Sequence, residues 1–392
     1  MTRSLITTAS LLAFASAVAA QDLPQATGSS VGGFLNNARY ELGKGLTFAS
    51  QDGGNSMTVG GQLQAGYSWT QFNLDGAGNV GDDYSFDSSF NTAARLRVGG
   101  SVMDSKYSYF VQMNAANGDQ GNGNLIDAWV GMHVADGINL RLGQQKMRSG
   151  LSADTSANDT DFETISRSSA TNEFANARTT GALLEGHAMD GRFNWHFGIA
   201  NGGTAANAAS QILFLAGGAN QANDDTDMMV TAGASFGSHA GNSESWSEGD
   251  LARSGEMQWI AGATITVDNG AAENFQTINV FGGLKAGNGL AAQAEYWTRD
   301  ADNADTTDDG AYVQASYTMA KSGSMQPGFV ARYAMVDFDN GVEGNEFTLG
   351  VNAYYAAHNL KWQLEYASGA TENFIADDID SSAIRLLCTV VF

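Results

Sequence analysis

The sequence predicts an all-β fold: a transmembrane antiparallel β-barrel of 16 strands, with short periplasmic turns and long extracellular loops. Three observations lead to this prediction. Segments of about ten to fifteen residues that alternate apolar with polar or small side chains recur from Thr58 to the C-terminus. The chain opens on an export signal. Past that signal, no apolar run approaches the roughly 18 residues that a membrane-spanning helix needs.

Residues 1–20 predict a signal peptide. Arg3 is its charged start, residues 5–15 are its apolar stretch, and residues 17–19 or 18–20 form a small-residue cleavage site. The rest of the chain divides into an N-terminal segment, residues 21–57, and the barrel, residues 58–392. Within the N-terminal segment we expect residues 31–42 to form a short helix or a periplasmic segment.

Composition excludes several classes of protein. The chain has 42 acidic and 19 basic residues, a net charge of −23, so it lacks the basic face that a nucleic acid partner requires. The single cysteine, Cys388, excludes a disulfide framework and a cysteine-rich metal centre. The five histidines show no metal-ligand spacing, and we expect no metal or other cofactor.

The alternating segments number sixteen, and a closed single-chain barrel requires an even count. The clearest covers residues 360–366, where one face is apolar and the other polar. Lipid can cover the apolar face, but edge amides cannot stay unpaired in lipid, so the sheet must close. A barrel of this size encloses an aqueous channel. The segments begin near residues 58, 88, 106, 123, 138, 178, 192, 226, 256, 274, 289, 309, 326, 345, 359 and 381.

The connections between these segments predict which end of the barrel faces which compartment. Short links rich in Asp, Gly and Asn follow most even strands, as in Asp136-Gly137, and such pairs suit hairpin turns. Longer links follow most odd strands, at residues 73–87, 148–177, 300–308 and 371–380. This asymmetry is typical of outer-membrane barrels. Two links break the rule: residues 238–255 are long where a turn is expected, and residues 269–273 are short where a loop is expected.

Strand alternation also predicts the lining of the channel. If the apolar alternates face lipid, the water-facing side carries nine basic against four acidic residues, and most remaining acid falls in loops. A wall of one sign raises the local concentration of counter-ions, here small anions. Alternatively, the basic residues pair with wall and loop carboxylates and hold the wall rigid. The predicted lining is Arg95, Arg97, Arg141, Arg192, Lys285, Arg299, Arg332, Lys361 and Arg385, with Asp127, Glu185, Glu295 and Glu365.

Several motifs, taken in order, carry a family resemblance. They are Gly45-Leu46-Thr47-Phe48, Gly60-Gly61-Gln62-Leu63-Gln64, Ala94-Arg95-Leu96-Arg97-Val98-Gly99-Gly100, Gly143-Gln144-Gln145-Lys146, Thr155-Ser156, Arg167, Phe174, Arg178-Thr179-Thr180-Gly181, Ile199-Ala200-Asn201-Gly202 and the terminal Phe392. Together they resemble the phosphate-selective porin O and P family of bacterial outer-membrane porins, over residues 44–203 above all.

The resemblance implies a homotrimer of sixteen-stranded barrels in which the third long loop, here residues 148–177, folds into the lumen as a constriction. It also implies that residues 21–57 lie on the periplasmic side, with an extra strand pairing that starts at residues 46–48. The sequence departs from the family pattern at Ala93, where the family often carries a second Arg, and at Arg148-Ser149, where a Pro-Phe pair is usual.

The constriction loop and its borders carry charges of both signs. Opposed charges across a constriction would orient polar solutes in transit, whereas a salt-bridged loop would neutralise itself. Near the end of its strand, Lys146 has the wrong parity for the lumen, and a bulge or the start of the loop would have to turn it inward. The candidate constriction residues are Lys146, Arg148, Arg167 and Arg178, with Asp154, Asp159, Asp161, Glu163 and Glu173.

The function predicted from these patterns is an outer-membrane porin that catalyses no reaction. It would pass small hydrophilic solutes with a tilt towards anions, phosphate among the candidates, in contact with outer-membrane lipid and lipopolysaccharide. Two alternatives stay open. An outer-membrane barrel enzyme of lipase or protease type could use His196 to activate a Ser. A secreted calcium-binding β-solenoid is disfavoured because no Gly-Gly-x-Gly-x-Asp repeat appears.

Overall fold

The computed structural model describes residues 38–76, 83–117, 125–155, 160–176, 178–202, 228–269, 274–302, 304–374 and 377–392. The predicted signal peptide and Asp159 lie outside these residues. The described chain is almost all sheet, with two short helices, α3 (Leu151–Asp154) and α4 (Ser169–Phe174), and one 3₁₀ turn, η1 (Ser243–Ser245). Among the described residues, no helix is long and apolar enough to cross a membrane.

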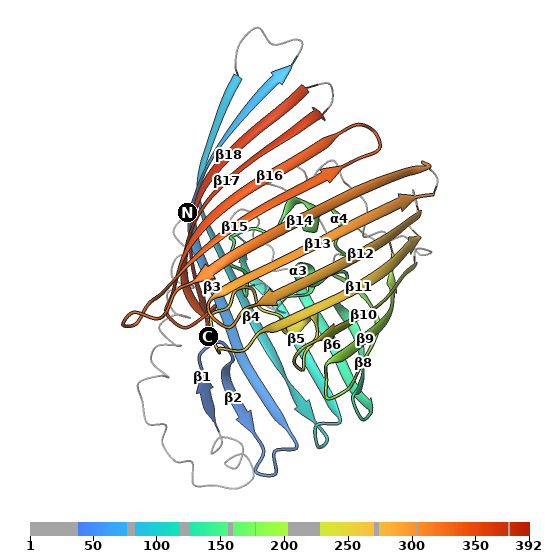
Figure 1. Ribbon diagram of the computed structural model, residues 1–392. Coiled ribbons are helices and arrows are strands. Elements are labelled where there is room, and N and C mark those ends of the chain that lie inside the picture. Colours follow the sequence, from blue (N-terminus) through green and yellow to red (C-terminus); the bar gives the residue numbers. More distant parts are fainter. Residues whose placement is uncertain are drawn as a thin grey trace, which may run out of the picture.

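Sixteen antiparallel strands form a closed barrel, as predicted (Figure 1). Each strand pairs with its neighbours in sequence, and the pairing of β18 with β3 closes the ring. The ring therefore leaves no open edge in the membrane. Its strands are β3 (Ser56–Gly76), β4 (Asp83–Val102), β5 (Tyr107–Asn117), β6 (Leu125–Ala135), β7 (Ile138–Lys146), β8 (Arg178–Ala188), β9 (Phe193–Asn201), β10 (Met228–Gly237), β11 (Gln258–Asn269), β12 (Asn274–Lys285), β13 (Leu290–Ala301), β14 (Thr306–Thr318), β15 (Gln326–Asp337), β16 (Glu343–Tyr354), β17 (Leu360–Phe374) and β18 (Asp377–Val391).

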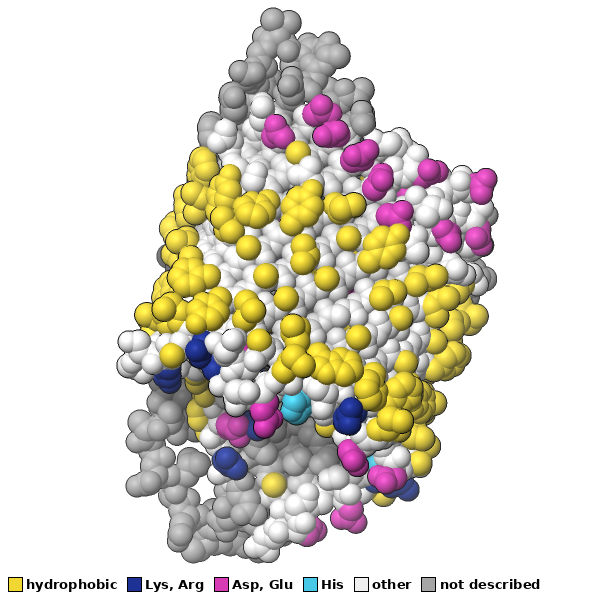
Figure 2. Space-filling model, viewed as in Figure 1, with side chains coloured by type: hydrophobic (Ala, Val, Ile, Leu, Met, Phe, Trp, Pro, Cys, Tyr) yellow, Lys and Arg dark blue, Asp and Glu magenta, His cyan; other side chains and the backbone are white. Residues whose placement is uncertain are grey.

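The two faces of the wall differ as the alternation predicts. Phe197, Trp362 and Leu364 are 44%, 46% and 50% exposed, whereas Lys361 and Gln363, which alternate with the last two, are 1% and 2% exposed. Because side chains alternate across a strand, the exposed apolar set is the outer surface and the buried polar set faces the lumen. On the face that Figure 2 shows, the apolar side chains form a band across the outside of the barrel. This band has the position expected of a lipid-facing belt.

The two ends of the barrel are unlike. The turn end carries short links between even and odd strands, and several of their residues have positive φ, among them Asp104 (57°), Gly137 (68°) and Gly287 (78°). At the opposite, loop end, three of the four predicted long loops are shorter than expected. Strands β3 and β4, β13 and β14, and β17 and β18 run through most of residues 73–87, 300–308 and 371–380. Past the lipid both faces meet water, so the apolar alternation stops while backbone pairing continues.

Two further strands lie outside the ring. β2 (Gly45–Ala49) pairs with the first residues of β3, Leu46 opposite Val59, and β1 (Arg39–Glu41) pairs with β2. Figure 1 shows both at the turn end. The extra pairing expected at residues 46–48 is present, but the described part of residues 31–42 contains a strand rather than a helix. Beyond the end of β18, the first residues of β3 have backbone groups that β18 does not pair. β2 pairs with these groups, and this pairing favours a strand over a helix in this segment.

Candidate channel and its charged lining

The described residues of the long link between β7 and β8 lie inside the barrel, against one side of the wall. Its helix α4 packs on β13 to β16, where Ala170 and Phe174 join a buried cluster with Trp297, Tyr312 and Ala334. The side chain of Ser168 caps the helix by accepting a hydrogen bond from the amide of Thr171 (3.0 Å). Apolar contact and a capped helix thus fix the shape of this segment, which we call the lumen loop (residues 147–177).

Carboxylates of the wall hold the backbone of the lumen loop. Glu295 accepts hydrogen bonds from the amides at the start of α3, those of Leu151 (2.8 Å) and Ser152 (2.6 Å). Glu365 accepts from the amide of Ile165 (2.7 Å), and Glu346 from that of Ser169 (2.9 Å). These are charge-assisted bonds in a buried setting, which are stronger than bonds between neutral groups. Two predicted lining carboxylates, Glu295 and Glu365, and the unpredicted Glu346 therefore hold the loop in place.

Basic residues of the wall complete the attachment. Arg332 donates to the Thr164 hydroxyl and the Ser166 carbonyl, both at 2.7 Å. Lys361 donates to the carbonyls of Thr160 (2.8 Å) and Phe162. These cations lie between wall and loop, so passing solutes do not meet them directly.

Ion pairs hold many of the charges of the wall and the lumen loop. Two link the wall to itself across neighbouring strands: Arg332 with Glu346 (2.6 Å) and Arg385 with Glu365 (3.0 Å). Two others involve the lumen loop or its border: Arg299 with Glu173 (2.9 Å), and Arg178 with Asp127 (3.1 Å). The pairing alternative raised from the sequence thus describes these positions.

The opposite side of the wall is open. On β3, β4 and β5 several inner side chains are polar and partly or fully exposed, and Ser68 and Ser89 hydrogen-bond to each other across the strands (3.1 Å). Arg95 is the one basic residue of this group, and Arg97 beside it is buried and donates to the Gly43 carbonyl. We call this surface the open face; it comprises Gln64, Ser68, Ser89, Asn91, Arg95 and Asn114.

The remaining predicted lining residues lie at the turn end. Arg141 pairs with Glu185 and with Glu244 (3.3 Å) on the inner side of the wall. Lys285, the last residue of β12, donates to the Ser247 hydroxyl (3.2 Å). The prediction for Arg192 is wrong. It precedes β9, lies exposed in the turn, and stacks its guanidinium over the ring of Phe236 (5.1 Å), because the strand starts one residue later than the pattern indicates.

The basic residues of the constriction segment also make defined contacts. Arg148 is buried and binds Glu185 (2.6 Å) and Glu244. Arg167 stacks over the Phe162 ring (4.9 Å). Lys146 reaches the Ala153 carbonyl in α3 (3.1 Å), so its side chain does turn to the lumen loop.

Burial raises the pKa of two acidic residues of the lumen loop, Asp154 and Glu163. Burial raises the pKa of Asp154, opposed by Arg148 and by the hydroxyl of Ser243, which donates to it (2.7 Å). Burial also raises the pKa of Glu163 to about 8, with the charge of Glu248 adding to the shift. Asp161 is half-buried beside them, and its carbonyl accepts from the amide of Glu248 (3.0 Å).

Among the described residues, the sequence interpretation missed at least five inner carboxylates. Glu346 and Asp268 alternate correctly on β16 and β11, so a stricter parity count would have found them. The other three lie in residues 238–257, the long link at the turn end, which folds up into the lumen instead of turning back. The unusual length of this link was the only available signal. Its inner carboxylates are Glu244, Glu248 and Asp250.

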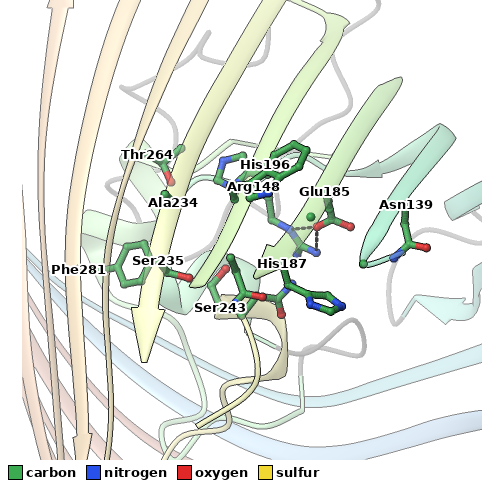
Figure 3. A pocket seen from close by; sticks show the side chains of 15 residues that line it. Asn139, Arg148, Glu185, His187, His196, Ala234, Ser235, Ser243, Thr264 and Phe281 are labelled. Carbon is green, nitrogen blue, oxygen red and sulfur yellow. Dashed lines mark hydrogen bonds and ion pairs between the residues drawn. The ribbon is translucent and has the colours of Figure 1, made fainter. Parts of the chain in front are cut away.

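A cavity of about 100 Å³ lies where this link meets the lumen loop. Figure 3 shows Arg148 and Glu185 bonded to each other at its edge, with His196 beside Arg148. The lining is mostly polar and includes Asn139, Ser235 and Ser243. Among the described residues, no group of three or more His, Cys, Asp or Glu side chains could hold a metal ion. The cavity is a small space with polar lining in a charged lumen.

A closed sixteen-stranded barrel with an apolar outer belt and a charged lumen defines a porin of the bacterial outer membrane. The chain belongs to the phosphate-selective porin O and P family, whose sequence model matches residues 57–385. No curated protein matches it.

Solved structures share the fold at low sequence identity. An anion-selective porin from Comamonas acidovorans is 13% identical with a TM-score of 0.55, covering 86% of this chain and 100% of that one. The outer membrane channel DcaP of Acinetobacter baumannii is 11% identical with a TM-score of 0.55, covering 88% and 99%. The trimer form of OmpT from Vibrio cholerae is 13% identical with a TM-score of 0.51, covering 86% and 99%.

Proposed function

We propose that this porin lets small hydrophilic solutes diffuse passively and prefers anions. One observation carries the preference: the carboxylates that fasten the lumen loop are at most 9% exposed, whereas several inner cations stay partly exposed. The buried carboxylates are Glu163, Glu173, Glu295, Glu346 and Glu365; the partly exposed cations are Arg95, Lys146, Arg167, Arg178 and Arg385.

The difference in exposure matters because water-accessible charges meet the permeating ion at close range. The buried carboxylates are shielded from the passage by the lumen loop and the wall, while the partly exposed cations are nearer to it and favour a positive field there. Asp161 is the half-buried counter-charge on the lumen loop. The family match and the anion-selective porin of similar fold agree with a positive passage. Inorganic phosphate is one anion that such a passage would admit.

The proposed activity is diffusion without catalysis. An enzyme of the barrel-hydrolase type would need a nucleophile within hydrogen-bond reach of a base. Within the part of the chain that the structure describes, the Nε2 of His196 is buried without a hydrogen-bond partner. This arrangement favours a channel over a hydrolase.

Planar bilayer recording tests the proposal. The purified protein should insert in discrete conductance steps, and in a salt gradient its reversal potential should have the anion sign. Arg95→Gln should lower the anion-to-cation permeability ratio, because it removes a partly exposed charge from the open face. Arg39→Gln is the control, since that side chain is 81% exposed on β1, outside the ring. A cation-sign reversal potential would contradict the anion preference.

We also infer that three copies assemble, with residues 21–57 on the periplasmic side after removal of a signal peptide at residues 1–20. The family membership supports this assembly, and the described strands β1 and β2 sit at the turn end. The mass of the detergent-solubilised protein, measured by light scattering, should equal three mature chains. A monomeric mass at the same detergent concentration would contradict it.

A further inference from the structure

The link between β10 and β11 enters the lumen from the turn end, opposite to the lumen loop. We call it the inner link (residues 238–257). Three of its carboxylates are anchored at separate places. Glu248 accepts from the side chains of Gln293 and Gln314 (both 2.8 Å), and Asp250 accepts from the amide of Gly289 (2.7 Å). Such anchoring holds the link inside the barrel.

Apolar packing seats the same link. Trp246 lies against the cluster of Leu151, Ile260 and Phe281, which joins the lumen loop to β11 and β12. The wall opposite Trp246 is Gly283, where an added Cβ would lie 2.6 Å from the indole ring. A glycine in a strand interior costs stability, and here it leaves room for the indole. The wall is therefore shaped to receive this link.

Glu244 is the third carboxylate, and it enters a cluster of four charges. Arg141 on β7, Arg148 on the lumen loop and Glu185 on β8 supply the other members. The side chain of Glu244 is 31% exposed, more than that of Arg141 (13%), Glu185 (16%) or Arg148 (2%). With Glu244 present the cluster is neutral, and without it the cluster carries one positive charge.

Glu244 is ionised in this setting. Burial opposes its charge, but Arg148 and then Arg141 outweigh burial and hold its pKa well below the ordinary range. The cavity described above lies beside the cluster and is lined by Arg148, Glu185, Asn242 and Ser243. A hydrated ion beside this cluster therefore meets a carboxylate that the inner link supplies.

We infer that the inner link forms a second constriction at the turn end, and that Glu244 sets the charge selectivity there. This inference rests on the proposed function only in assuming a conducting pore. Glu244 limits the preference for anions by neutralising the Arg141 and Arg148 pair together with Glu185. Charge selectivity then has two sources. One is the set of partly exposed cations named under the proposed function, and the other is the neutral four-charge cluster that contains Glu244.

Reversal potentials of matched variants test this assignment. Glu244→Gln should raise the anion-to-cation permeability ratio about twofold or more, because one negative charge leaves a narrow hydrated space. Glu244→Asp should keep the wild-type ratio. Glu256→Gln is the control: the same charge change in the same link, on a side chain that is 76% exposed. Arg141→Gln should move the ratio in the opposite direction.

The opposite shifts separate charge from structure. If Glu244 only holds the link in place, Glu244→Gln and Arg141→Gln would both loosen it and shift the ratio the same way, which would overturn the inference. An unchanged ratio in Glu244→Gln would also overturn it. A cation-sign reversal potential in the wild type contradicts the proposed anion preference alone, and a shift towards anions in Glu244→Gln would still support the role of Glu244.

Discussion

At the scale of single residues, the charges of this lumen act mainly as fasteners. Arg332 shows the pattern: it pairs with Glu346 on the next strand and donates to two groups of the lumen loop. Both side chains are nearly inaccessible, at 3% and 1%. A buried ion pair stabilises a protein little more than a pair of apolar side chains of similar size would. Removing one partner of the ion pair, however, leaves an uncompensated buried charge. Stability should therefore respond sharply to loss of either partner.

Arg332→Ala should lower the free energy of unfolding by about 3–5 kcal/mol, because Glu346 would remain buried without its cation. Urea unfolding in lipid vesicles measures this change. Arg39→Ala is the matched control, since that guanidinium is 81% exposed and 3.8 Å from Glu41; its effect should stay within about 0.5 kcal/mol. Equal effects of the two variants would show that burial of the pair is irrelevant.

The raised pKa of Glu163 predicts that the attachment of the lumen loop to the wall, which we call its seating, depends on pH. Below pH 4.5 its carboxyl is protonated whether the loop is seated or not. Between pH 4.5 and about 8, Glu163 keeps its proton when the loop is attached to the wall but ionises when the loop is detached. Attachment of the loop therefore becomes less favourable as the pH rises through this range, and its free energy no longer changes above about pH 8. Glu248, Lys361 and Lys285 act on the same carboxyl, and Asp161 acts on the two lysines.

Open-channel current fluctuations measure this seating. They should increase from pH 5 to pH 8 in the wild type, and the increase should be smaller in Glu163→Gln, which cannot ionise. The same pH dependence in both proteins would assign the effect to another group. The charge of Glu248 stays in place in both proteins, so the comparison isolates Glu163.

At the scale of elements, the hairpins of the loop end continue past the lipid. β14 shows this on one face: Val313 is 54% exposed on the outside, and Thr307 lies on the same face nearer the loop end. Val313→Arg should destabilise the barrel by about 2–4 kcal/mol, the cost of a cation near the middle of the membrane, and Thr307→Arg by about 0–1 kcal/mol. Urea unfolding in vesicles distinguishes them, and equal costs would place both residues in lipid.

The strands could be predicted from sequence because lipid imposes a strict alternation. All sixteen begin within a few residues of their predicted positions. The ends of β13 and β17 could not be predicted from the sequence. Polar residues such as Asp300 and Glu372 lie outside the lipid, where they are compatible with either a loop or a strand. Parity placed Arg332 and Lys361 on the inner side, but no pattern could show that the lumen loop would cover them. The inner link was invisible because nothing in residues 238–257 states which way it folds.

At the scale of the whole molecule, charge is sorted by position. Acidic side chains gather at the loop end, as Figure 2 shows above the apolar band. They include Asp300, Asp302, Asp305, Asp337, Asp339, Glu343, Glu372, Asp378 and Asp380, all exposed. In the lumen, the carboxylates that hold the backbone of the lumen loop are buried, whereas Arg95, Arg167 and Arg385 stay partly exposed. A strongly acidic protein can thus enclose a passage with a positive field.

The account depends on one arrangement: the lumen loop covers the β13 to β17 side, and solutes pass along the open face. Cysteine accessibility tests it most directly, in a Cys388→Ser background that removes the single native thiol. A charged, membrane-impermeant thiol reagent should react with Ser89→Cys on the open face and reduce the current. Thr348→Cys, at a position 0% exposed beneath the lumen loop, should not react. Equally fast reaction at both positions would contradict the account.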